Sequence, residues 1–199
     1  NLERHINNIK KFGLTPIVAI NSFILDTKKE ISAVKDFCKS QKVEVSESTH
    51  WADGGKGAKD LAKKVVKICK NSKKKNFKFL YKDNQSLWSK VETISKEIYK
   101  AASITADESI KKQLKIFQDN GYGKLPVCIA KTQYSFSVDP KLKGAPTGHE
   151  ISIREVRLSS GAEFIVVVCG SIMTMPGLPR VPAADKIRLN KKGNIEGLF

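Results

Sequence analysis

The sequence contains no run of about 18 consecutive apolar residues, the length that a membrane-spanning helix needs. Its first residues, NLERHINNIKKFG, are charged and amphipathic and lack the apolar core of a secretory signal peptide. We therefore expect no membrane-spanning segment and a cytoplasmic location, with an organelle as the open alternative. The chain also lacks an initiator methionine, which we interpret as an indication that it begins within a longer protein.

Cysteine and histidine are scarce and scattered. The four cysteines are far apart, lie in apolar stretches and form no CxxC pair: Cys38, Cys69, Cys128 and Cys169. Such cysteines are typical of buried, reduced thiols rather than of disulfides or metal ligands. The three histidines are His5, His50 and His149. Because they form no cluster with the cysteines, we expect no metal site.

No match to the phosphate-binding pattern GxxxxGK[ST] occurs, and no aromatic-interleaved basic motif of an RNA-binding domain is present. The net charge is nevertheless +16, mostly from lysine. Such a field attracts polyanions. A solvated lysine-rich surface explains most of this charge, and a small polyanionic ligand is the second explanation. Nucleic-acid binding is the least favoured of the three.

Apolar periodicity in the first 83 residues predicts an α/β unit. Helical spacing over 2–12 is followed by a continuous apolar strand in TPIVAINSF, a capped helix over 27–39 and an alternating strand in KVEVSES. A second helix, ending at about residue 70, and a third strand, FKFLY, complete the pattern. The order β-α-β-α-β predicts a parallel, doubly wound unit over 1–83.

The remaining sequence predicts a helical pair over 84–124 and a β-rich, loop-rich carboxyl-terminal part over 125–199. Ser86 and Thr105 are the expected helix starts, and LPVCIA is another buried strand. Further on we expect neighbouring strands in EISIREVRL and FIVVVCGSIM, neither helix nor central strand in MPGLPRVPAA, and a short terminal hairpin around Lys192-Gly193.

Two aromatic side chains follow the first two predicted strands. Phe23 ends NSF after the first strand, and Trp51 opens WADGGKG after the second. Loops at the carboxyl ends of parallel strands are where open α/β sheets bind ligands. If the two strands are neighbours, both rings project into one crevice and could hold a flat ligand between them. Core packing of either ring is the alternative.

Other loop residues form weaker candidate sites. Gly54, Gly55 and Gly57 resemble an anion-binding turn with Lys56 as its cation, although a simple helix start explains them equally well. The remaining candidates at the border of a cleft or nucleotide site lie in KTQYS and PGLP: Lys131, Thr132, Gln133, Pro176 and Gly177. We assign no catalytic residue, and His50 has no visible nucleophile to serve as its partner.

The motifs PIVAINSF, HWADGGKGAKDLA, GYGKLPVCIAKTQYSFS, DPKLKGAPTG and TMPGLPRVPAADKI…GLF, in this order, resemble the carboxyl-terminal third of formate–tetrahydrofolate ligase, also called 10-formyltetrahydrofolate synthetase. The resemblance covers essentially all of 1–199 as one folate-side domain of a larger enzyme. It implies an ATP-dependent ligase that joins formate to tetrahydrofolate through formyl phosphate, with Mg²⁺ accompanying ATP and no prosthetic group. It also implies that Phe23 and Trp51 pack against the pterin ring.

The same resemblance implies what this chain does not supply. The family's phosphate-binding loop and most of its ATP pocket lie in amino-terminal domains that have no counterpart in 1–199. We therefore expect the chain to supply one wall of the cleft, to be inactive alone, and to belong to a homo-oligomer, usually a tetramer. The alternative from another class is a non-enzymatic pterin- or anion-binding module, or a subunit that needs a partner chain.

Overall fold

The computed structural model describes residues 1–72, 77–131, 135–172 and 179–197. The first part of the chain runs through α1 (Leu2–Lys11), β1 (Ile17–Asn21), α2 (Lys28–Ser40), β2 (Glu44–Ser48), the single turn α3 (His50–Asp53), the 3₁₀ turn η1 (Gly54–Ala58) and α4 (Lys59–Asn71). β1 and β2 are parallel neighbours, paired from Ile17–Glu44 to Asn21–Ser48. The first β-α-β unit expected from the sequence is therefore confirmed.

The start of α2 follows directly from its local sequence. The Thr27 hydroxyl accepts a hydrogen bond from the Glu30 backbone N–H at 3.3 Å, and the Glu30 carboxylate accepts one from the Thr27 N–H at 2.9 Å. This reciprocal capping box satisfies two backbone donors that a helix start otherwise leaves free. It fixes where the loop after β1 ends, and hence the length of the loop that carries Phe23.

The prediction of a third strand in FKFLY is wrong. Residues 77–81 form no strand. The Phe77 ring stacks on Phe12 at 6.3 Å between centroids and meets Phe79 at 5.0 Å, while the Lys78 N–H donates to the Phe12 carbonyl at 2.9 Å. The segment therefore packs at the end of α1, because its aromatic side chains find partners there, and the first sheet has two strands.

The two-stranded sheet is more open than its apolar sequence predicted. Ala19 of β1 is exposed and its neighbours are half-buried, so the continuous covering expected on both faces is not found. α2 and α4 pack against β2. No residue of α4 is buried, and Val65 and Val66 are exposed. Within the described ranges, the chain has too few layers here to enclose a parallel sheet.

A second, four-stranded sheet has the order β3-β5-β6-β4, with β3 (Ser103–Ala106), β4 (Val127–Ala130), β5 (Glu150–Ser159) and β6 (Phe164–Cys169). β5 and β6 are antiparallel, which confirms the predicted neighbouring strands. At the edges of the sheet, β3 lies parallel to β5 and β4 lies parallel to β6. The short 3₁₀ turns η3 (Tyr122–Lys124) and η4 (Ser160–Ala162) lead into β4 and β6.

Helices α5 (Leu87–Glu97) and α6 (Glu108–Asp119) pack with this sheet around the main core. The core includes Val91, Leu114, Ile151 and Ile165. Burying a side chain of this size stabilises the fold by about 1.5–3 kcal/mol. This core holds β4 and β6 in place, and Lys131 comes directly after β4.

Two local predictions in this part need correction. Thr105, expected at a helix start, lies in β3, and Asp107 occupies the N-cap position of α6 without a side-chain capping bond. Cys128, expected to be buried, is exposed, as is Cys69 on α4, whereas Cys38 and Cys169 are buried. Val127 and Ile129 pack against the core. Because side chains alternate along a strand, Cys128 between them points to the opposite face. All four cysteines are free.

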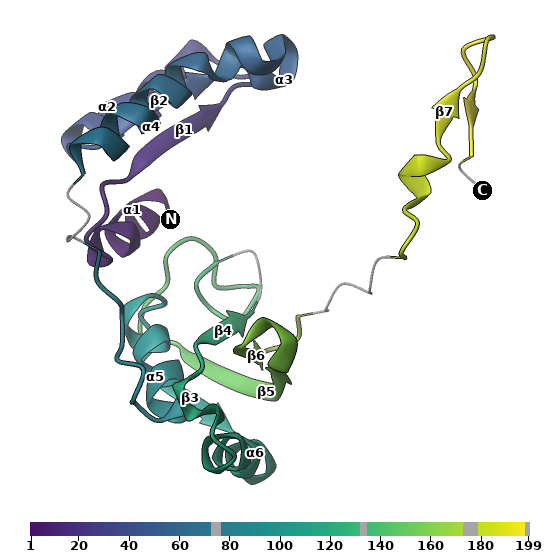
Figure 1. Cartoon of the computed structure of the whole chain (residues 1–199). Coiled ribbons are helices and arrows are strands. Elements are labelled where there is room, and N and C mark those ends of the chain that lie inside the picture. The colour runs from purple at the N-terminus through teal and green to yellow at the C-terminus, as the bar shows by residue number, and fades with distance from the viewer. Residues whose placement is uncertain (73–76, 132–134, 173–178, 198–199) are drawn as a thin grey trace.

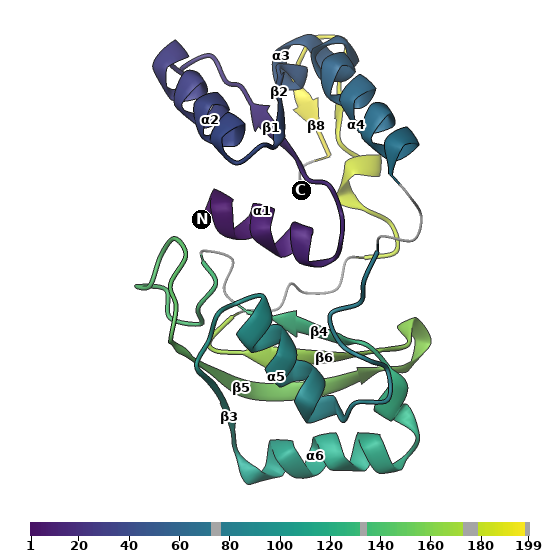
Figure 2. The same cartoon turned by 90° about the vertical axis from the view of Figure 1, so that its left-hand side faces the viewer.

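Helix α1 connects the two sheets and lies between them in Figure 2. The Asn8 amide donates to the Ile98 carbonyl at 3.1 Å, and the Lys11 ammonium pairs with Glu97. At the other end of the helix, the His5 ring lies 4.7 Å from the ring of Phe136. The first sheet is thus attached to the second through polar and aromatic contacts of one helix.

The carboxyl-terminal tail extends away from both sheets in Figure 1. It contains the 3₁₀ turn η5 (Ala183–Asp185) and an antiparallel pair, β7 (Arg188–Leu189) and β8 (Ile195–Glu196). This pair confirms the predicted terminal hairpin, with Gly193 at its turn in the left-handed region, at φ 81°. Of the segment MPGLPRVPAA, residues 175–178 lie outside the described residues, and residues 179–182 form neither helix nor strand, as their prolines predicted. Its last two residues, Ala183 and Ala184, begin the 3₁₀ turn η5, so the prediction is wrong there.

Candidate functional site

Phe23 is held by a compact turn directly after β1. The Asp26 carboxylate accepts a hydrogen bond from the Phe23 N–H at 2.8 Å, and the Asp26 N–H donates to the Phe23 carbonyl at 3.0 Å. These two bonds close the loop on itself before the capped start of α2. The backbone of Phe23 is therefore fixed although its side chain is 53% exposed.

Trp51 lies in α3, directly after β2, and its side chain is 73% exposed. The Ser22 N–H donates to the Ser48 carbonyl at 3.0 Å, which continues the pairing of β1 and β2 by one step beyond the strands. The two loops consequently leave the sheet side by side. The sequence prediction that Phe23 and Trp51 come from neighbouring loops depends on this strand order.

The two rings lie 6.1 Å apart between centroids, with 57° between their planes. This separation is within the 4.5–7 Å range of interacting aromatic pairs. Ile24 and Leu25, next to Phe23, are 96% and 89% exposed. Sequence reasoning missed both, although three consecutive apolar residues in a loop were a signal for them. Exposed apolar residues that gather in this way mark a surface for a ligand or another protein segment.

Carboxylates at this edge of the sheet are engaged in holding the loops. Glu47 of β2 accepts hydrogen bonds from the Lys35 ammonium at 2.7 Å and from the Ser22 hydroxyl at 3.1 Å, and these bonds lower the pKa of Glu47. Asp60 accepts from the Ser46 hydroxyl at 2.7 Å, which lowers its pKa in the same way. Both groups are therefore ionised at neutral pH and contribute to structure.

The glycines after Trp51 differ in what they do. Gly54 has a φ of 57°, in the left-handed region, and ends α3. Gly55 has open space where a side chain would be, and Gly57 has none. The three glycines therefore form a tight turn after Trp51. Lys56 lies among them in η1.

Lys131 belongs to the other sheet, at the end of β4, and so lies apart from the aromatic pair in the fold. Its ammonium donates to the Ser135 carbonyl and lies 5.0 Å from the centre of the Tyr99 ring. Burial lowers the pKa of Lys131 and raises the pKa of Tyr99 to about 12. The other residues predicted near this loop and in PGLP lie outside the described residues: Thr132, Gln133, Pro176 and Gly177.

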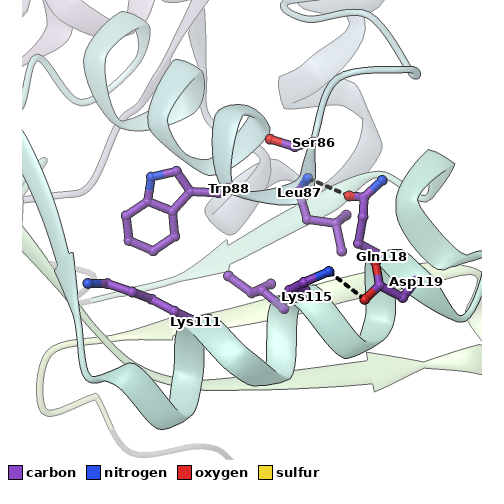
Figure 3. Close-up of a pocket in the computed structure, with 8 residues that line it drawn as sticks. Ser86, Leu87, Trp88, Lys111, Lys115, Gln118 and Asp119 are labelled. Carbon is purple, nitrogen blue, oxygen red and sulfur yellow. Dashed lines mark hydrogen bonds and ion pairs between the residues drawn. The ribbon is translucent and has the colours of Figure 1, made fainter.

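Two hollows of the structure lie away from the aromatic pair. One, of about 490 Å³, lies between α5 and α6, and Figure 3 shows the Trp88 indole and the Lys111 side chain facing each other across it. Its far end is closed by a hydrogen bond from the Leu87 N–H to the Gln118 side chain at 3.0 Å and by the ion pair of Lys115 with Asp119 (Figure 3).

The second hollow, of about 860 Å³, is lined by residues near the amino ends of β1 and β2, among them Ile17 and Glu44. It therefore lies at the opposite end of the first sheet from Phe23 and Trp51. Parallel strands present ligand-binding loops at their carboxyl ends. The aromatic pair, at that end, is for this reason the stronger candidate site.

The described ranges contain no group of three or more His, Cys, Asp or Glu residues placed to hold a metal ion. None of the helices described is long and apolar enough to cross a bilayer.

Comparison with known proteins gives one consistent family. The family model for formate–tetrahydrofolate ligase matches residues 1–199. The chain is 61% identical over its full length to the formate–tetrahydrofolate ligase of Pelagibacter ubique, 57% identical to that of Ruegeria pomeroyi and 54% identical to that of Rhizobium meliloti. Each match spans all 199 residues of the chain, but only 35%, 36% and 35% of the length of those relatives. On this match, the chain belongs to the formate–tetrahydrofolate ligase family.

Proposed function

We propose that this chain is the carboxyl-terminal third of an ATP-dependent formate–tetrahydrofolate ligase and forms the wall of the active-site cleft that binds the pterin ring. The observation that carries the proposal is the pair of exposed rings, Phe23 and Trp51, 6.1 Å apart on loops that leave two paired parallel strands. The family match supports the reaction class, and the ring geometry supports the part that this chain has in it.

An aromatic pair suits a pterin for a physical reason. A flat heterocycle that stacks on an aromatic side chain gains about 0.5–1.5 kcal/mol beyond the area that it buries. The loops of Phe23 and Trp51 are fixed by backbone hydrogen bonds before any ligand arrives. Little ordering is then needed on binding, which favours affinity.

We assign ATP, its Mg²⁺ and formate mainly to parts of the enzyme outside this chain. The sequence has no GxxxxGK[ST] pattern to hold phosphates, and no residue of it is assigned a catalytic role. Gly54, Gly55 and Lys131, with the KTQYS and PGLP residues named above, are proposed as a border of the cleft or nucleotide site. Amino-terminal domains complete the enzyme, which we propose is a cytoplasmic homotetramer.

Calorimetric titration with tetrahydrofolate tests this proposal. We expect Trp51→Ala and Phe23→Ala to weaken binding by about tenfold or more, because ring stacking and buried area are both lost. Phe79→Ala is the matched control, since Phe79 is an exposed aromatic residue that contacts Phe77 rather than the pair. Stacking also predicts little change in affinity between low and high salt, whereas binding to a nucleic acid would weaken steeply.

The same variants are measured in the complete ligase, where the amino-terminal domains close the cleft. Binding that depends on Trp51 in both forms shows that the site is preformed on this chain. Binding that depends on Trp51 only in the complete ligase shows that closure is required. Unchanged tetrahydrofolate binding by Trp51→Ala in both forms would contradict the proposal.

A further inference from the structure

The helix that carries Trp51 cannot hold its own orientation. α3 is a single turn of four residues, His50–Asp53, and neither α3 nor η1 contains a buried residue. A helix this short is marginal in water, because its first turn fixes several dihedral angles for very few hydrogen bonds. The position of the Trp51 indole must therefore be set by contacts of the surrounding loop.

One of these contacts is made by Gly57. Its carbonyl accepts a hydrogen bond from the Thr49 N–H at 3.2 Å, which brings the end of η1 back against the start of α3. A Cβ atom at Gly57 would lie 2.5 Å from the Thr49 carbonyl carbon and 2.6 Å from the His50 nitrogen. Both are backbone atoms, so a side chain at this position displaces the Thr49–His50 peptide, one residue before Trp51, by about 1 Å.

A side-chain hydrogen bond closes the same turn from the other side. The Thr49 hydroxyl donates to the Asp53 carboxylate at 2.6 Å, across the residues that contain Trp51. The Asp53 N–H donates back to the Thr49 carbonyl at 2.9 Å. Thr49 is therefore fixed by Gly57 and by Asp53, and Trp51 lies within the loop that they close.

We propose that Gly57 and the Thr49–Asp53 hydrogen bond are positioning elements that set the indole of Trp51 against the ring of Phe23 for tetrahydrofolate. None of these residues needs to touch the substrate. This inference rests on the proposed function and identifies what keeps that site in its binding geometry. It also gives a physical reason for a glycine-rich turn directly after a large exposed ring.

The test compares Gly57→Ala with Gly161→Ala in the complete ligase, by steady-state kinetics. Gly161 is the matched control, since it lies in another 3₁₀ turn, η4, outside the proposed site, with no atom within 4 Å of an added Cβ. We expect Gly57→Ala to raise KM for tetrahydrofolate roughly 10- to 100-fold, as expected for misplacing a binding group by about 1 Å. KM for ATP should not change, and Gly161→Ala should behave as the unmodified enzyme.

Asp53 provides a second test that does not depend on a tight backbone contact. Asp53→Ala removes the acceptor for the Thr49 hydroxyl and should raise KM for tetrahydrofolate selectively. Asp53→Asn keeps an acceptor oxygen and should restore KM to near the unmodified value. Selective loss and rescue in this pair support the inference even if Gly57→Ala does not fold.

The possible failures are distinguishable. If Trp51→Ala raises KM for tetrahydrofolate but Gly57→Ala and Asp53→Ala do not, the positioning inference is wrong and the proposed function stands. If Gly57→Ala or Asp53→Ala raises KM for ATP and tetrahydrofolate equally, the residue acts on the fold and positioning is contradicted. If Trp51→Ala leaves KM for tetrahydrofolate unchanged, the proposed function is overturned together with the inference.

Discussion

Lys90 is the largest fully buried side chain of the described residues. Its ammonium donates to the Gly123 carbonyl at 2.8 Å and to the Leu125 carbonyl at 3.0 Å, and lies 5.6 Å from the centre of the Tyr81 ring. Burial lowers the pKa of this group. Lys90 of α5 thus satisfies the carbonyls of the turn that leads into β4. The sequence did not reveal this role, because a lysine in an amphipathic helix is ordinarily expected on the solvent-facing side.

We predict that Lys90→Met lowers the free energy of unfolding by about 1–3 kcal/mol, because the buried Gly123 carbonyl and the partly buried Leu125 carbonyl lose their donor. Lys96→Met is the matched control on the same helix: Lys96 is exposed and pairs with Glu92 one turn away. Removing such a surface pair should cost only about 0.3–0.5 kcal/mol. Urea denaturation measures both, and equal effects of the two substitutions would contradict the role given to Lys90.

Elements defined by local pattern could be predicted from the sequence. The strand over 17–21, the capped helix after Thr27 and the strand pair β5–β6 each have a periodicity or a cap that belongs to the residues themselves. The error at FKFLY has a different origin, because a strand also needs a partner, and Phe77 finds Phe12 instead. β3 was missed because its four residues are too few to show alternation.

The features of the candidate site also divide into those that the sequence could predict and those that it could not. That Phe23 and Trp51 lie in neighbouring loops follows from strand order, so the sequence alone could predict it. The close approach of Gly57 to Thr49 depends on how the chain returns after α3, and no pattern of residue types encodes a distance. Ile24 and Leu25 were visible as apolar loop residues, but their exposure depends on what covers them.

In β2, the carboxylate of Glu47 predicts that the free energy of unfolding of the chain depends on pH. The pKa of Glu47 is lowered below 4.5 in the folded chain by the bonds from Lys35 and Ser22, so the folded form binds its proton less readily than the unfolded form. The stabilisation is complete above the unfolded pKa and is lost as pH falls through the folded pKa.

Glu47→Gln should therefore lower the denaturation midpoint near pH 6 and have a smaller effect near pH 3, where the unmodified carboxyl is also protonated. Glu44→Gln is the matched control, an exposed glutamate in the same strand. Chemical denaturation at both pH values checks the prediction. A Glu47→Gln effect that is the same at both pH values would show that the carboxylate charge does not hold the loop.

In Figure 1 the described part of the chain forms two sheets with α1 between them and a terminal tail that carries β7 and β8. Apolar side chains are exposed in the loops at the carboxyl edge of the first sheet. The length of the chain is about 35% of that of its relatives. An open two-stranded sheet and an exposed aromatic pair are what one wall of a larger cleft should show when the opposite wall belongs to another domain. The net charge of +16 adds a field that attracts anions.

From this arrangement we predict that the 199-residue chain alone makes no 10-formyltetrahydrofolate when it is mixed with ATP, Mg²⁺, formate and tetrahydrofolate. Phosphoryl transfer is catalysed by positioning and charge stabilisation around the phosphates. The sequence contains no GxxxxGK[ST] pattern to hold phosphates for that purpose. Chromatographic detection of 10-formyltetrahydrofolate, with the complete ligase as the positive control, checks this prediction. Product that depends on both ATP and formate in the chain alone would require phosphate-binding residues within 1–199 and would overturn the division of the cleft proposed for this enzyme.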